Sequence, residues 1–295
     1  MSRIIRYALI VGLTACVPQQ TVRPTPAAAE PVTAVARRAA ATSPPPIFWI
    51  EAPIAGDPSP VWAQVPRTGV VVEDGRIRLL RPSVAETPRR VAIQAGHWRT
   101  DEAPAEFPRL RFSSGGEAAG IREVDVTRDV AERVAAVLTE RGIVVDMLPA
   151  TVPPSYLADV FVALHADADA TGTARGFKIA HGSYRSPEDE RLVGLLTEHY
   201  AAGTGLPRDR NVTTDMTDYY AFAWFRYEHA LAPHTAAAIM ELGFISHPED
   251  RSLLVDQPDL VARSVAEGII RFLDAVPRSE LFGEDIIIPQ ASPRP

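Results

Sequence analysis

The stretch VAIQAGHWRT, residues 91–100, begins with five residues that suit a buried strand and continues with a glycine, a histidine and a tryptophan. Four more strand candidates follow along the chain, at residues 143–147, 159–164, 176–180 and 236–240. Short, mostly apolar runs of this kind are typical of strands that are covered on both faces. We therefore expect residues 91–95 to form the first strand of a buried central sheet.

Segments with helical periodicity lie between these strands. Residues 123–141 place Val126, Val130, Val134 and Leu138 at steps of four and end at a glycine. Residues 187–202 and 258–273 both begin with a proline, which is favoured in the first turn of a helix. Strands that alternate with helices predict an α/β fold with a mostly parallel mixed sheet and helices on both faces.

The first 16 residues carry the features of an export signal. Arg3 and Arg6 precede an apolar run of residues 7–15, which is too short to span a bilayer. The order Leu-Thr-Ala-Cys that ends at Cys16 resembles the bacterial lipobox, and this implies a lipid anchor to the cell envelope on the side facing the cell wall. The alternative is an ordinary signal peptide with an incidental cysteine. Both interpretations predict an exported protein.

The composition divides the rest of the chain into four parts. Residues 17–46 are rich in proline and alanine and predict a disordered tether. Residues 47–90 predict a short N-terminal extension with a hairpin around Asp74 and Gly75. Residues 91–276 form the expected catalytic domain, and residues 277–295 the expected loose tail.

Charge and rare residues exclude several functions. The net charge of −7 argues against a nucleic-acid partner, because proteins that bind nucleic acids usually carry clustered positive charge. The single cysteine, Cys16, leaves no disulfide within the chain. Lys178 is the only lysine, and nothing around it in the sequence supports a lysine nucleophile.

Polar residues follow the ends of three predicted strands. His97, His165 and Glu241 come at or just after these ends, and the carboxyl ends of parallel strands meet at one edge of the sheet. Glu123 opens the first predicted helix, whose N-terminus faces the same edge. Two imidazoles and one carboxylate with an open fourth position are typical of catalytic zinc, and a second carboxylate could transfer protons. The periodicity does not decide which glutamate has which role.

Four motifs occur here in a known order: AGH after a strand, a glutamate that opens the next helix, ADVFVALHADA, and ELGFISHPED. In this respect the sequence resembles the zinc-dependent N-acetylmuramoyl-L-alanine amidases of the AmiC-like type over roughly residues 91–273. The resemblance implies a three-layer phosphorylase/hydrolase-like fold and one Zn²⁺ ion held by His97, Glu123 and His165. It also implies that Glu241 is the catalytic acid and base. The expected substrate is peptidoglycan, in which these enzymes hydrolyse the amide between N-acetylmuramic acid and L-alanine.

The sequence departs from the family pattern beside the first histidine and in one long segment. Gln94 stands where an aspartate or similar residue is usual, and Trp98 replaces a glycine. Residues 218–234 are rich in aromatic residues, and Arg226 within them is a candidate for an arginine of the family. Trp98 and Arg226 are therefore candidate substrate contacts. The sequence indicates no particular stem peptide, glycan or protein activator.

Two other functions stay open at this point. The first is a different zinc hydrolase on the same fold, a carboxypeptidase or an N-acyl amino acid amidohydrolase. The second is a wall-binding lipoprotein without activity, and the presence of all four site groups argues against it. His229 and His234 flank a proline at a spacing that fits no helical pair of metal ligands, so we do not expect them in the site.

Overall fold

The structure is a computed structural model, and it describes residues 47–49, 70–73, 76–79, 88–184, 186–282 and 286–289. The predicted export signal, Cys16 and the predicted tether lie outside the described residues. No helix in the described part of the chain has the length and apolar character that crossing a membrane requires.

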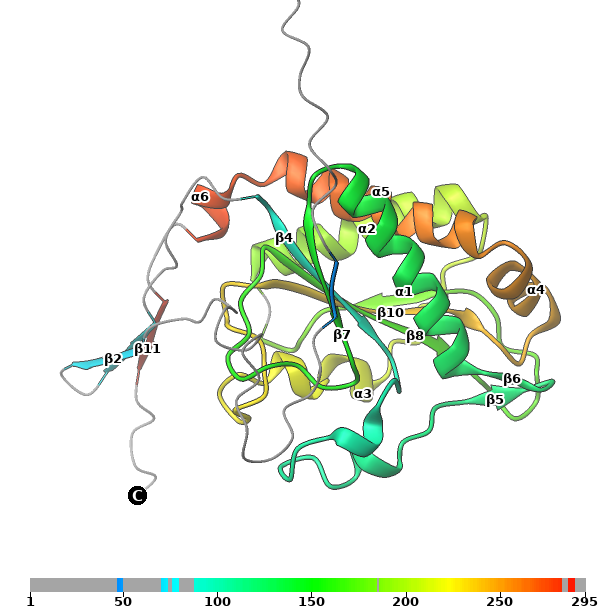
Figure 1. The fold of residues 1–295 in the computed structure, drawn as a ribbon, viewed down its shortest axis with the longest axis horizontal. Coiled ribbons are helices and arrows are strands. Elements are labelled where there is room, and N and C mark those ends of the chain that lie inside the picture. Colours follow the sequence, from blue (N-terminus) through cyan, green and yellow to red (C-terminus); the bar gives the residue numbers. More distant parts are fainter. Residues whose placement is uncertain are drawn as a thin grey trace, which may run out of the picture. The chain divides into compact units, whose positions relative to one another are not determined.

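A six-stranded sheet forms the centre of the fold, with the strand order β1-β7-β4-β8-β10-β9 (Figure 1), and its edge strand β1 comes from the predicted N-terminal extension. Its strands are β1 (Ile47–Trp49), β4 (Arg90–Ala95), β7 (Val144–Leu148), β8 (Val160–Asp167), β9 (Lys178–Ala180) and β10 (Ala236–Phe244). Five of them run parallel, and β9 pairs with β10 in the antiparallel direction at the edge. The predicted α/β fold with a mostly parallel mixed sheet is thus confirmed.

Two strands continue further than the apolar runs indicated. We expected β8 to end at residue 164 and β10 at residue 240, but their pairing continues through Glu241 and His165, which are opposite each other. The ladder becomes irregular only between Glu241 and Phe244. The two polar side chains therefore belong to strands rather than to loops, and the sheet itself holds them.

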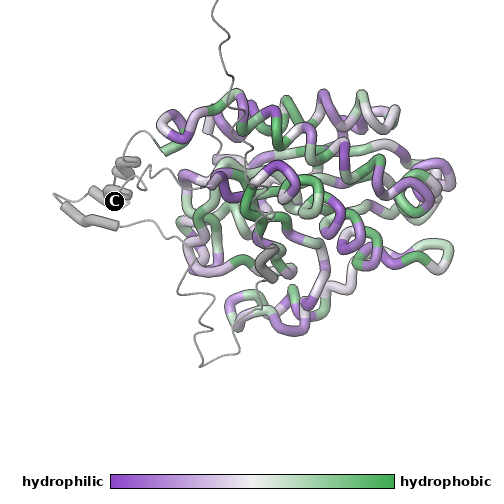
Figure 2. The backbone as a smooth tube through the Cα atoms, turned by 45° about the horizontal axis from the view of Figure 1, so that its top comes forward, coloured by the Kyte–Doolittle hydropathy of each residue, from purple (hydrophilic) through white to green (hydrophobic). Residues whose placement is uncertain are grey.

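The three long helices pack together on one face of the sheet. They are α1 (Glu123–Glu140), α2 (Pro187–Thr204) and α5 (Pro258–Ala275), all drawn on the same side in Figure 1. Alternate strand residues such as Ile93 and Val162 form one core cluster with their buried side chains. Figure 2 shows the corresponding pattern, in which hydrophobic and hydrophilic positions alternate around the helices.

Short helical turns and irregular segments cover the opposite face of the sheet. Here α3 (Thr214–Thr217), a 3-10 turn at Tyr220–Phe222 and residues 150–158 lie over the other set of strand side chains. Tyr156 and Phe161, both fully buried, belong to this second cluster. Helices thus lie on both faces, but only a single turn of α-helix covers this one.

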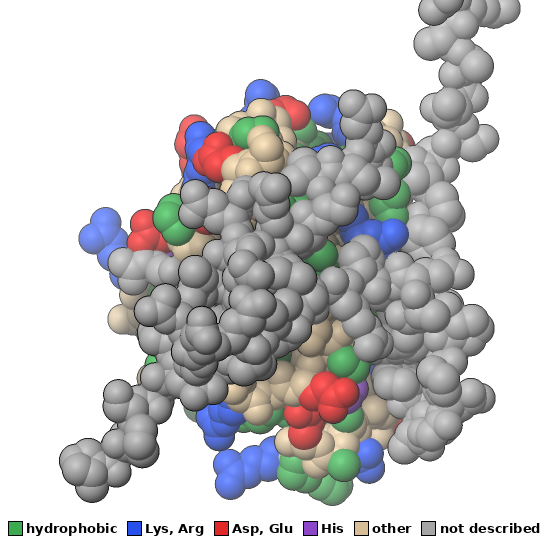
Figure 3. Space-filling model, turned by 90° about the vertical axis from the view of Figure 1, so that its left-hand side faces the viewer, with side chains coloured by type: hydrophobic (Ala, Val, Ile, Leu, Met, Phe, Trp, Pro, Cys, Tyr) green, Lys and Arg blue, Asp and Glu red, His purple; other side chains and the backbone are tan. Residues whose placement is uncertain are grey.

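Smaller elements complete the described chain. Strands β2 (Val70–Glu73) and β3 (Arg76–Leu79) pair in antiparallel register on either side of residues 74–75, as the hairpin motif predicted. The tail that we expected to be loose contains α6 (Arg278–Leu281) and β11 (Ile286–Pro289), and β11 pairs with β3. The remaining elements are β5 (Glu117–Ala118), β6 (Ile121–Arg122) and α4 (Pro248–Asp256). On the face in Figure 3, acidic and basic side chains are interspersed over the described surface.

Candidate active site

His97 lies on a tight turn that follows β4. The turn residue is His97 itself, whose φ of 62° is in the left-handed region. Gly96 is required for a steric reason. A Cβ atom there would lie 2.6 Å from the His165 ring and 2.7 Å from the Leu164 carbonyl oxygen. The absence of a side chain at this position lets the loop press against the end of β8.

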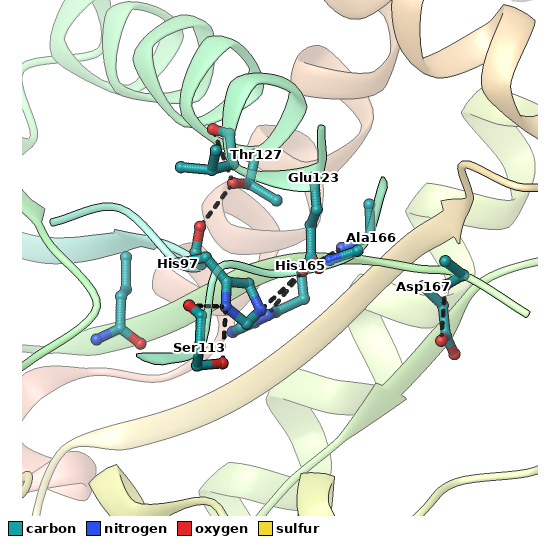
Figure 4. Close-up of polar contacts among 12 residues, drawn as sticks. His97, Ser113, Glu123, Thr127, His165, Ala166 and Asp167 are labelled. Carbon is teal, nitrogen blue, oxygen red and sulfur yellow. Dashed lines mark hydrogen bonds and ion pairs between the residues drawn. The ribbon is translucent and has the colours of Figure 1, made fainter. Parts of the chain in front are cut away.

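The His97 ring is held from one side. Its Nδ1 lies 2.9 Å from the Ser113 carbonyl oxygen, and since a carbonyl can only accept, Nδ1 carries the hydrogen (Figure 4). The other nitrogen, Nε2, faces Glu123 Oε1 at 3.3 Å, and in the neutral ring it is the nitrogen that can bind a metal. Fixing the tautomer through one ring nitrogen is the usual way to present the other to a metal.

Glu123 occupies the first position of α1 and is almost completely buried. Backbone N–H groups of Gly116 and Ala166 donate to its two carboxylate oxygens at 2.8 and 3.1 Å. His165 Nδ1 lies 3.0 Å from Oε1. Burial opposes ionisation of this carboxyl, but the contacts with His165 and His97 outweigh it and hold its pKa well below the usual range.

The three side chains form a compact set of donor atoms. One nitrogen of each histidine and one oxygen of Glu123 lie within 4.8 Å of one another. The remaining nitrogen of His165, Nε2, is buried and has no hydrogen-bond partner among the described residues. Two neutral imidazoles and a carboxylate are the donors that zinc prefers in catalytic sites. The residues present therefore fit a zinc ion, and the structure brings together all three predicted ligands.

Glu241 lies beside this set on the neighbouring strand. It is opposite His165 on β8 and opposite Lys178 on β9, so the three side chains form a row across the sheet. Its Oε2 atom is buried and has no hydrogen-bond partner in the described part of the chain. Burial, followed by the charges of Glu123 and Asp167, raises the pKa of Glu241 well above its ordinary value. These effects favour the protonated form of the carboxyl.

Lys178 is a residue that the sequence analysis missed. It is 4% exposed, its ammonium group pairs with Asp167, and Asp209 lies 3.7 Å away. Its positive charge lowers the pKa of Glu241, against the effect of burial. The sequence did contain a signal, because the single lysine stands at the start of a predicted strand. Its role becomes clear only once the pairing of β9 with β10 is known.

Gln94 connects the sheet to the aromatic segment over the site. It is fully buried, its Oε1 accepts from the Tyr219 hydroxyl at 2.6 Å, and its Nε2 donates to the Pro149 carbonyl at 3.0 Å. Tyr219 in turn lies edge-on to the His165 ring, with 6.0 Å between the ring centroids. Gln94 therefore acts on the site through Tyr219 and is itself closed to substrate.

The other candidate residues make their contacts outside the group of His97, Glu123 and His165. Trp98 packs against the main core, with the guanidinium groups of Arg99 and Arg128 over its ring. Arg226 is exposed and lies over Tyr227. His229 pairs with Glu106 at 2.5 Å, so it is not a member of the ligand set.

Comparison with known proteins supports the assignment of the family. Residues 91–271 match the Amidase_3 family, described as N-acetylmuramoyl-L-alanine amidase. No curated protein matches the chain significantly.

Solved structures of such amidases are similar at low identity. The enzyme Ami1 from Mycobacterium smegmatis is 19% identical, with 66% of this chain and 100% of that chain covered and a TM-score of 0.47. An amidase from Clostridium difficile 630 is 18% identical, with 64% and 98% covered and a TM-score of 0.45. A putative amidase from Neisseria meningitidis is 22% identical, with 63% and 96% covered and a TM-score of 0.43. The match to the family, which spans more than half of the chain, confirms the resemblance that the motifs indicated: this chain belongs to the Amidase_3 family of N-acetylmuramoyl-L-alanine amidases.

Proposed function

We propose that this amidase hydrolyses the bond between N-acetylmuramic acid and L-alanine in peptidoglycan with zinc held by His97, Glu123 and His165, and with Glu241 as acid and base. The observation that carries the proposal is the compact donor set, with Glu241 next to His165 across the sheet. When bound there, zinc supplies a Lewis acid that polarises the amide carbonyl and makes water acidic enough to react at neutral pH.

Glu241 performs the proton transfers in this proposal. It accepts a proton from the attacking water as the new carbon–oxygen bond forms. It then delivers this proton to the amide nitrogen as the carbon–nitrogen bond breaks, so that L-alanine leaves as a neutral amine. The environment of Glu241 suits both steps, because burial favours its protonated form while Lys178 favours the ionised one.

Paired substitutions test these roles. Glu241→Gln should keep one zinc per chain and lose turnover of purified peptidoglycan, whereas His97→Ala and His165→Ala should lose both. Elemental analysis and mass spectrometry of the products are the measurements. Release of intact stem peptides is expected, and release of single amino acids would instead identify a carboxypeptidase. Full activity of Glu241→Gln would refute the role of this residue.

We further propose that the mature chain is lipidated at Cys16 and held at the envelope by residues 17–46. A tether raises the local concentration of the catalytic domain near the wall. Mass spectrometry of the mature N-terminus tests this, because a chain that begins elsewhere than at Cys16, or carries no lipid there, would contradict it.

A further inference from the structure

An open hollow lined by aromatic side chains lies near the start of β10, away from the metal ligands. Its lining includes Tyr184, Phe222 and Trp224 together with the polar groups of Asp189 and Thr235. Tyr184 is 76% exposed and Phe225, which contacts it, is 54% exposed. A single exposed aromatic ring is ordinary, but adjacent exposed rings that form a patch are typical of a surface that binds a ligand or partner.

The rings are arranged as a platform rather than as separate side chains. Phe225 lies between Tyr184 and Trp224, with centroid separations of 4.8 and 5.6 Å. These edge-to-face contacts hold the three rings against one another. The enclosed part of the hollow measures only about 30 Å³, which is room for a group the size of one or two water molecules. A ligand would therefore lie on the rings and insert one small substituent.

Fixed polar groups define the chemistry of that substituent. Both carboxylate oxygens of Asp189 already accept backbone hydrogen bonds, from Ser186 and Ala237 at 2.8 Å each. The carboxylate is thus held in place, and each oxygen keeps a lone pair for a further donor. An acetamido group offers one N–H donor and one methyl group, which suit a carboxylate beside aromatic walls. A negatively charged ligand, such as an anionic lipid headgroup, would be repelled by Asp189.

The hollow and the proposed metal site are built partly on the same segments of the chain. The segment from Tyr219 to Leu231 that contributes its wall also places Tyr219 beside the His165 ring. Along β10, Ala237 lines the hollow and Glu241 lies four residues further on, a separation of about 13 Å at the rise of a β-strand. Ile239, which lies between these two residues on the same face of the strand, is 3% exposed, so the hollow is separate from the proposed metal site.

We propose that the platform of Tyr184, Trp224 and Phe225 is a glycan subsite that binds an N-acetylated amino sugar of the peptidoglycan chain, with the acetamido N–H facing Asp189 and the acetamido methyl group entering the hollow. The inference rests on the proposed function for the identity of the polymer. The recognition itself depends only on the sugar, whose C–H face packs on aromatic rings.

Binding of a sugar chain without peptide tests the subsite separately from the amidase reaction. The probe is a tetramer of N-acetylglucosamine, titrated by calorimetry into the zinc-loaded full chain. We expect a dissociation constant in the millimolar range and binding about tenfold weaker for the neutral tetramer of glucose, which has hydroxyl groups in place of the acetamido groups. Binding of both tetramers alike would overturn the role of the acetamido group. No binding up to about 10 mM, or binding only to vesicles of anionic phospholipid, would overturn the subsite.

Matched variants locate the binding. Tyr184→Ala with Phe225→Ala should weaken binding of the tetramer by about tenfold or more, and both residues are exposed enough for the fold to survive, which circular dichroism can check. Phe112→Ala removes another exposed aromatic ring, 87% accessible, and should leave binding unchanged. Unchanged binding in the double variant, or equal loss in Phe112→Ala, would overturn the assignment. Glu241→Gln should bind the tetramer normally. If this variant also kept full turnover of peptidoglycan, the proposed role of Glu241 in the amidase reaction would fail while the sugar subsite would stand.

Discussion

Gly96 offers a sharp test of how the metal ligands are positioned. In Gly96→Ala the new Cβ would lie 2.6 Å from the His165 ring, whereas ordinary contacts begin at 3.4 Å. The ring or the loop would have to move by about 0.8 Å, and the Leu164 carbonyl oxygen, 2.7 Å away, blocks the alternative direction. Zinc sites tolerate departures of only about 0.2 Å in ligand distance. The substitution should therefore weaken zinc binding as well as folding.

The expected magnitudes follow from that displacement. Overpacking in a buried site costs about 1 to 3 kcal/mol of unfolding free energy. Loss of ligand orientation typically lowers metal affinity by about 10-fold to 100-fold. Urea unfolding of the zinc-free protein measures the first quantity, and competition with a chromogenic chelator measures the second.

The chain provides a matched control at Gly194 in the middle of α2. A Cβ atom there meets nothing within 4 Å, so Gly194→Ala should stabilise the protein by about 0.5 to 1 kcal/mol and leave zinc affinity unchanged. If Gly96→Ala behaved like Gly194→Ala in both assays, the close approach between the His97 loop and β8 would not be what positions His165.

Two further predictions concern buried polar groups. Gln94→Leu leaves the Tyr219 hydroxyl and the Pro149 carbonyl without their partner, so the unfolding free energy should fall by about 1 to 3 kcal/mol, and an unchanged urea midpoint would contradict this. In zinc-free protein the raised pKa of Glu241 means that folding becomes less favourable as the pH rises from its unfolded value of about 4.5 towards the folded value. Glu241→Gln should therefore unfold at a higher temperature than wild type at pH 7 but not below about pH 4, and equal melting temperatures at pH 7 would refute the effect.

The strands were predictable because each is a short apolar run whose residues are buried on both sides. The apolar pattern predicted ends for β8 and β10 that were too early. An apolar run stops at the first polar residue, whereas the backbone hydrogen bonds between the strands continue past it. His165 and Glu241 were nevertheless identified, because polar residues at the carboxyl end of a parallel strand reach the same edge whether they end the strand or follow it.

Contacts between distant segments could not be predicted in this way. The role of Lys178 depends on the antiparallel pairing of β9 with β10, and an apolar run does not reveal its direction. The packing of all three long helices on one face is equally hidden, because an apolar stripe shows that a helix packs but not against which side of the sheet. The close approach at Gly96 likewise exists only in three dimensions.

The unequal cover of the two faces explains how this chain can differ from its relatives without losing its chemistry. Strand side chains alternate between the faces, so His165 and Glu241 point away from α1, α2 and α5 and toward the loop-covered side. The proposed metal ligands are fixed by the sheet, the turn after β4 and the start of α1, whereas the wall above them comes from irregular segments. Gln94 is fully buried, so any effect of this departure on substrate choice must pass through the position of Tyr219. Variation in substrate preference should therefore follow residues 218–234 rather than the zinc ligands.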